Sequence, residues 1–144
     1  MRDDPTPFPQ RNKMANEITV TTSLGMANGN FEASMRASGV KIDQSALAAA
    51  AGIVSVTTNV TTLSLGIVTS AGYASFRNLN TATAGTAYIA IGSYVGTNLH
   101  EFAKLERSDV STLRLKPTIT IGYRTYTAVG YATAVSMQYL VTSE

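Results

Sequence analysis

The 144-residue sequence predicts an all-β protein, an antiparallel β-sandwich or a jelly-roll-like barrel of about 8–10 short strands. Thr, Val and Ile, whose branched Cβ atoms suit a pleated sheet, make up 39 of the residues. Apolar and polar side chains alternate along many short segments, and turn residues recur about every ten positions. Many short strands at this spacing are typical of sandwiches and barrels.

The N-terminal residues 1–16 are expected to form an extended, Pro-rich arm outside a single sandwich domain that spans residues 17–144. Three of the four prolines and five charged residues lie within the first thirteen positions, a composition that buries little apolar surface. An arm of this kind becomes ordered when something ties it down, so we expect it to lie along a neighbouring subunit. Phe8 is its one large apolar side chain and therefore its expected anchor.

The domain is expected to begin with a β-hairpin. Ile18, Val20 and Thr22 share one face of a first strand, and Asn28-Gly29 provides a turn in which both residues tolerate positive φ. A second strand follows, with the alternating set Phe31, Ala33, Met35 and Ala37 on one face and Glu32, Ser34 and Arg36 on the other. A separate short strand is expected at 40–42.

Residues 46–51 (ALAAAA) have high helix propensity, but the alternating continuation GIVSVTT favours a strand of small side chains over a helix. Beyond this segment the pattern predicts further strands, the last of them broken near Gly130. Their expected ranges are 62–65, 71–77, 87–94, 101–105, 110–115, 118–124 and 126–139.

Full charges are missing from two long zones. Arg77 is the only one between Gln44 and Leu99, and there is none from Thr125 to Ser143. Either the outer faces of the sandwich are coated in Thr, Ser and Asn, or these strands lie against other subunits, since interface cores are poor in Lys, Glu and Asp and rich in Tyr. The second alternative predicts a homo-oligomer and an interface built around the tyrosines of these zones: Tyr73, Tyr88, Tyr94, Tyr131 and Tyr139.

Catalytic and cofactor chemistry is not indicated, and we expect no enzyme, no cofactor and no metal. There is no cysteine, and the only histidine, His100, would point away from its neighbour Glu101 on a strand. Glu106 and Asp109 flank Arg107-Ser108 at an expected turn, where a solvated tip is favoured over an acid and base pair.

Nucleic acid and membrane partners are not indicated either. The net charge of +2 comes from scattered residues with no basic stripe. The longest apolar run has nine residues, roughly half of what a membrane-spanning helix needs, and the N-terminus lacks the apolar core of a secretory signal.

Four segments in order resemble a layout common in small structural proteins of tailed bacteriophages. They are Arg77-Asn78-Leu79 at a strand end, the strand Tyr88-Ile89-Ala90-Ile91-Gly92, Phe102-Ala103-Lys104-Leu105, and Leu113-Arg114-Leu115 after a charged turn. The resemblance covers about residues 61–143. The charged turn usually contains a glycine, and here Arg107-Ser108-Asp109 stands in its place. Asn78 is expected to fix the turn after its strand through local hydrogen bonds to the backbone.

The resemblance implies a non-enzymatic virion component on the outer surface of the particle. Our leading hypothesis is a capsid decoration or cement protein that binds the major capsid protein or other virion proteins and forms a homo-oligomer, with a trimer as one form. A neck, tail or fibre-associated protein of the same particle is the alternative. A carbohydrate-binding attachment module comes third, because such modules stack sugars on exposed aromatic rings and this chain has seven Tyr but no Trp.

Overall fold

The computed structural model describes residues 18–28, 31–42, 48–80, 88–126 and 135–144. Within these ranges the chain is all β, with antiparallel sheets and no helix, so the predicted fold class is confirmed. Phe8 lies outside the described residues together with the rest of the expected arm, and so does Tyr131. The ten strands are β1 (Ile18–Asn28), β2 (Phe31–Ile42), β3 (Ala49–Val56), β4 (Thr61–Thr62), β5 (Ala71–Asn78), β6 (Tyr88–Val95), β7 (Asn98–Leu105), β8 (Val110–Arg114), β9 (Ile121–Tyr126) and β10 (Val135–Ser143).

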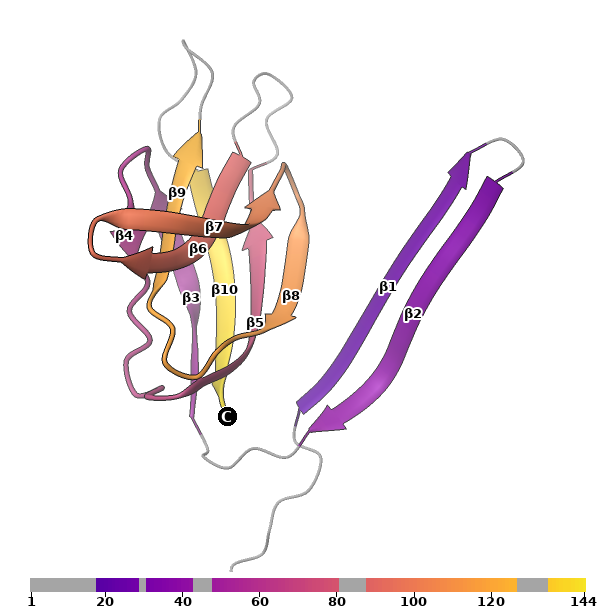
Figure 1. The fold of residues 1–144 in the computed structure, drawn as a ribbon, viewed down its shortest axis with the longest axis horizontal. Coiled ribbons are helices and arrows are strands. Elements are labelled where there is room, and N and C mark those ends of the chain that lie inside the picture. Colours follow the sequence, from indigo (N-terminus) through magenta and orange to yellow (C-terminus); the bar gives the residue numbers. More distant parts are fainter. Residues whose placement is uncertain (1–17, 29–30, 43–47, 81–87, 127–134) are drawn as a thin grey trace, which may run out of the picture. The chain divides into compact units, whose positions relative to one another are not determined.

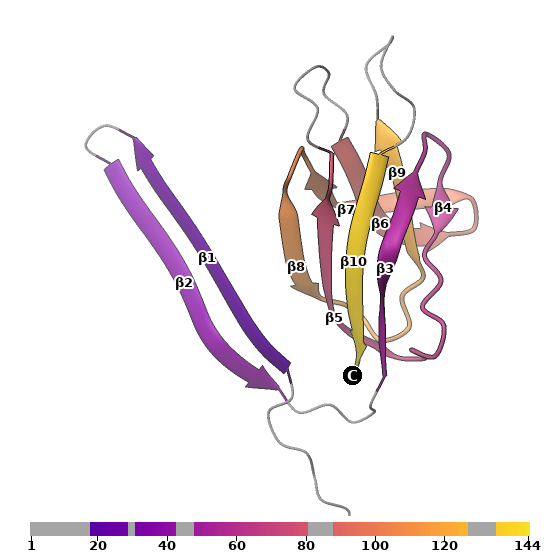
Figure 2. The ribbon, with the colours of Figure 1, turned by 180° about the vertical axis from the view of Figure 1, so that it is seen from behind.

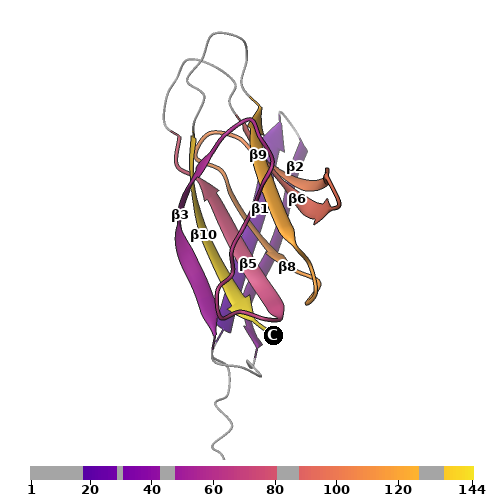
Figure 3. The same ribbon diagram turned by 90° about the vertical axis from the view of Figure 1, so that its left-hand side faces the viewer.

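Strands β3 to β10 form a sandwich of two four-stranded sheets (Figure 1). One sheet has the order β3-β10-β5-β8, whose strands lie side by side in Figure 2. The other has the order β4-β9-β6-β7, and Figure 3 views the two layers from the side. Among the described strands of the sandwich, only β6 and β7 are both consecutive in the chain and paired, so most connections pass from one sheet to the other and tie the layers together.

The core lies between the sheets because every second residue of the central strands points inward. Phe76 of β5 and Met137 and Val141 of β10 face Ile89 and Ile91 of β6, and all five side chains are fully buried. Large and branched apolar residues occupy the inward positions, whereas the outward ones are mixed: Gln138, Ser75 and Thr112 lie there together with exposed Ile53, Val110 and Leu140. The same alternation therefore supplies the core and sets which side chains face outward.

Strands β1 and β2 form a compact unit of their own, because contacts divide the chain into residues 1–44 and 45–144. The two strands pair antiparallel from Ile18 opposite Ile42 to Asn28 opposite Phe31, which confirms the predicted hairpin. Within the described residues neither strand pairs with a strand of the sandwich. The predicted domain boundary followed residue 16, whereas the boundary between compact units falls after Gln44.

Several strand limits differ from the expected ones. The expected strand at 40–42 is the end of β2, and Gly39, with φ of 64°, lies at a register shift within it. The strand expected at 62–65 is only Thr61–Thr62, because a turn follows in which the Val68 N–H donates to the Leu65 carbonyl. β9 begins at Ile121, after a turn in which the Ile119 N–H donates to the carbonyl of Lys116.

The charged turn between β7 and β8 has the backbone of a glycine turn without the glycine. Ser108 has a φ of 63°, and the Asp109 N–H donates to the Glu106 carbonyl across the turn over 3.1 Å. A residue with a Cβ is strained in this left-handed region, by about 1–2 kcal/mol.

Ser108→Gly should therefore stabilise the sandwich, by about 0.5–1 kcal/mol once the greater freedom of glycine in the unfolded chain is counted. Urea unfolding measures the change. The matched control is Ser111→Gly within β8, where the same replacement should destabilise by a similar amount because the backbone there is extended. A destabilising Ser108→Gly would show that the turn does not hold this conformation.

Candidate interaction surface

The outer face of the β3-β10-β5-β8 sheet includes a nearly uncharged part, and the pairing of the strands fixes which residues share it. Ile53, Gln138, Arg77 and Val110 follow one another across the four strands in one row. The next row contains Ala51, Leu140, Ser75 and Thr112. We call these eight residues the sheet face; Arg77 is its one charged member.

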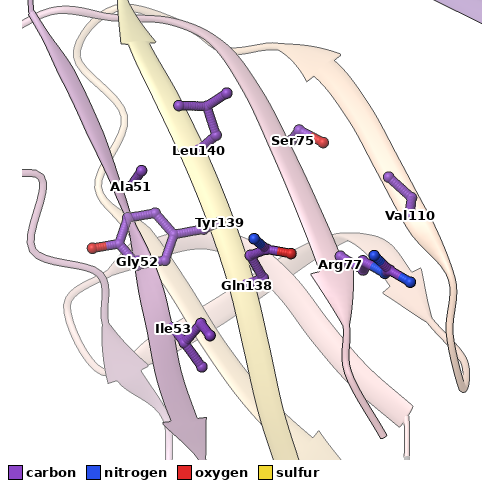
Figure 4. A pocket seen from close by; sticks show the side chains of 9 residues that line it. All are labelled: Ala51, Gly52, Ile53, Ser75, Arg77, Val110, Gln138, Tyr139 and Leu140. Atoms are coloured by element: carbon purple, nitrogen blue, oxygen red, sulfur yellow. The ribbon is translucent and has the colours of Figure 1, made fainter. Parts of the chain in front are cut away.

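The sheet face exposes large apolar side chains. Ile53 is 63% exposed, Val110 59% and Leu140 46%. Together with Tyr139 they border a shallow hollow of about 530 Å³, which Figure 4 shows lying across all four strands. A flat, open hollow lined by Ile, Leu and Val suits a protein surface better than a small molecule, because small-molecule sites enclose most of their ligand.

Arg77 is exposed near the end of β5 and, within the described part of the chain, makes no ion pair. Farther along the same sheet Arg114 pairs with Glu144, and its guanidinium lies 5.9 Å from the centre of the Tyr73 ring. The charge at that corner is therefore balanced within the chain. Arg77 offers an unbalanced cation to whatever covers the sheet face.

The other sheet has a different outer surface. Tyr88 stacks on Tyr126 with ring centres 4.9 Å apart, and Lys104 lies 4.4 Å above the Tyr88 ring. Arg124 lies 4.2 Å from the centre of the Tyr126 ring and donates to Glu101 over 2.9 Å, and the Tyr126 hydroxyl also donates to Glu101. This cluster carries both signs of charge and satisfies them locally, as a solvated surface does.

The turn tip after β7 also carries balanced charges. Lys104 donates to Glu106 over 2.8 Å, and the Glu106 N–H donates to the Asp109 carboxylate over 2.9 Å. The hydrogen bond from Lys104 lowers the pKa of the Glu106 carboxyl. Because that pKa is lowered on folding, its stabilising effect is present at neutral pH and is lost as the pH falls through the lowered value. The arrangement is an exposed turn tip whose charged groups are hydrogen-bonded to one another.

The predicted interface tyrosines do not gather on one surface. Tyr73 lies beside Arg114, and Tyr88 belongs to the aromatic cluster of the opposite sheet. Tyr94 is half-buried on β6, and Tyr139 is half-buried on β10. The Tyr139 ring covers Gly52 closely: a Cβ added at Gly52 would lie 3.2 Å from the ring. Sequence reasoning missed the sheet face itself, whose apolar members are Ile53, Val110 and Leu140.

Asn78 anchors the end of β5 as expected, and it also connects the two sheets. Its Oδ1 accepts from the Asn80 N–H over 2.9 Å, which fixes the local turn. Its Nδ2 donates to the Leu105 carbonyl at the end of β7 over 3.2 Å, and the side chain is fully buried. A buried amide with both ends satisfied is a structural element, so Asn78 holds the end of β5 against the end of β7.

The chain matches no family model, no curated protein and no solved structure. In the described residues, no group of three or more His, Asp or Glu side chains is placed to hold a metal ion. The same residues include no helix with the length and apolar character needed to cross a membrane.

Proposed function

We propose that this protein is a non-enzymatic structural component of a tailed-bacteriophage particle, a decoration or cement protein that binds the assembled head through its sheet face. Its partner is the major capsid protein or another virion subunit. A protein that binds the assembled shell, but not its free subunits, stabilises that shell by mass action. A neck, tail or fibre position in the particle is the alternative, and copy number separates the two.

The observation that carries the proposal is the difference between the two outer faces of the sandwich. One sheet presents ion-paired Lys104, Arg124 and Glu101, whereas the other presents exposed Ile53 and Leu140 beside Arg77, with the Arg114–Glu144 pair farther along the sheet. Depletion of charge with exposed apolar side chains marks a surface that is covered by protein. The partner should place a carboxylate opposite Arg77, because an unpaired buried cation is costly.

The size of the sheet face argues for attachment in many copies. Four strands at about 4.8 Å and about 20 Å of strand length give roughly 400 Å². A standard interface buries about 800 Å² on each partner, so the sheet face supplies about half. The remainder has to come from other segments or from neighbouring copies, and a repeated array on a shell provides neighbours.

The tyrosine rings give less support to a carbohydrate-binding module. Tyr88 stacks on Tyr126 and also contacts Lys104, while Arg124 and Arg114 lie against Tyr126 and Tyr73. Sugars stack on free ring faces, and each of these rings already faces a partner within the chain.

Ile53→Asp should strongly weaken attachment while leaving the fold intact. The protein is added back to particles that lack it, and occupancy is measured against concentration. A carboxylate buried in an apolar contact should weaken binding by at least about 2 kcal/mol, or about 30-fold.

The matched control is Val95→Asp, a similar change at a similarly exposed position, 60% against 63%, on the other sheet. It should bind as the unchanged protein does. Equal occupancy by both variants would remove the sheet face from the attachment site.

A further inference from the structure

The hairpin β1–β2 has one apolar face and one polar face. Leu24 lies opposite Met35, Met26 opposite Ala33, and Val20 opposite Val40, all on one side of the two-stranded sheet. The other side contains Ser23 opposite Arg36 and Ala27 opposite Glu32. We call the first set the hairpin face; it carries no charge.

The hairpin face is open over most of its length. Met35 is 75% exposed, Leu24 72%, Met26 54% and Val40 45%. An isolated two-stranded hairpin is marginally stable at best in water, since it lacks a second layer to bury its apolar side. An ordered hairpin with this composition therefore needs a covering surface.

The surface that covers the hairpin face should itself carry no unpaired charge. The sheet face of a neighbouring copy contains the exposed Arg77, which an uncharged hairpin would bury without a counter-charge. A second copy of the hairpin has no such charge and has the same width and pattern, so the two apolar faces are complementary to each other. Two sheets stacked about 10 Å apart would then form a small four-stranded core.

We propose that two copies of this chain associate by stacking their hairpin faces, with Leu24 and Met35 at the centre of the contact. This interface is separate from the sheet face and does not depend on the proposed virion function. Eleven residues at about 3.3 Å and two strands give a face of roughly 350 Å², so the pair buries roughly 700 Å². That area is below the usual range for stable complexes, and the association is therefore weak, in the micromolar range or above.

Sedimentation of the full chain, from roughly 10 µM to roughly 1 mM, tests the stacking. The unchanged protein should increase in mass with concentration, and Met35→Glu should raise the dissociation constant about tenfold or more. The matched control is Ser34→Glu, the adjacent residue on the polar side, which should associate as the unchanged chain does. A chain that stays monomeric throughout, or a Met35→Glu variant that associates normally, overturns the proposal.

Single cysteines test the geometry without a charge, and they are clean probes because the chain has none of its own. Under mild oxidation Met35→Cys should give a covalent dimer, and Ser34→Cys should not. Equal cross-linking at both positions would contradict face-to-face stacking. Flotation of monomeric protein with phosphatidylcholine vesicles, lost in Met35→Glu, would identify a lipid surface as the occupant instead and overturn the proposal.

Discussion

Asn78→Asp should lower the free energy of unfolding at pH 7 by about 3–5 kcal/mol, the usual cost of a buried charge without a partner. The carboxylate keeps the acceptor for the Asn80 N–H but loses the donor to the Leu105 carbonyl, and two buried oxygens then face each other. Urea unfolding at several pH values measures the effect. Burial raises the pKa of the new carboxyl in the folded state, so the loss should shrink as the pH falls and the acid regains a proton to donate.

The matched control is Asn98→Asp, the same chemical change at an exposed position in β7. It should alter stability by less than about 0.5 kcal/mol. If Asn78→Asp were equally mild and independent of pH, the side chain would not connect the ends of β5 and β7.

Phe76→Ala should cost about 3–5 kcal/mol, because it removes a fully buried ring between the two sheets and leaves a cavity. Phe76 lies on β5, opposite Tyr139 of β10 and Ser111 of β8, so the cavity would open beneath the sheet face. Thermal and urea unfolding measure the loss, and attachment of the surviving folded fraction should weaken as well.

Phe102→Ala is the control for this change, since Phe102 is 43% exposed on β7. It should cost less than about 1 kcal/mol. A cost at Phe102 equal to that at Phe76 would mean that the core is not centred between these sheets.

Alternation and turn residues predicted most of the strands. Ala71–Asn78, Tyr88–Val95 and Val110–Arg114 lie within a residue or so of their expected limits, and Ala49–Val56 is a strand although its alanines favour a helix. This segment is a strand because its backbone pairs with β10, which runs alongside β3 from Thr142 to Val135. The limits that sequence missed depend on backbone turns, such as the one closed by the Leu65 carbonyl, in which Gly66 has a φ of 56°.

The sheet face could not be predicted from the sequence, although the lack of charge in its strands was visible there. Ile53, Gln138, Arg77 and Val110 come from four distant segments, and only the register of the strands places them in one row. The lack of charge was visible, but it could not distinguish the outward positions from the inward ones. The tyrosines were the more visible candidates, and several of them instead contact Arg, Lys or one another.

The hairpin face and the sheet face are two distinct surfaces with few or no charges. One carries Arg77 and suits a partner with a carboxylate, and the other is charge-free and suits its own copy. A subunit with one surface for a shell and another for its neighbour can form a network over that shell, which is how a cement protein would stabilise it.

The central claim is that the protein is a structural component of a virus particle, and its copy number per purified particle tests this most directly. Quantitative mass spectrometry against the major capsid protein gives the ratio. We predict a ratio near one copy per capsid subunit; a ratio lower by tens of fold would favour the neck or tail alternative. Complete absence of the protein from purified particles would contradict the account.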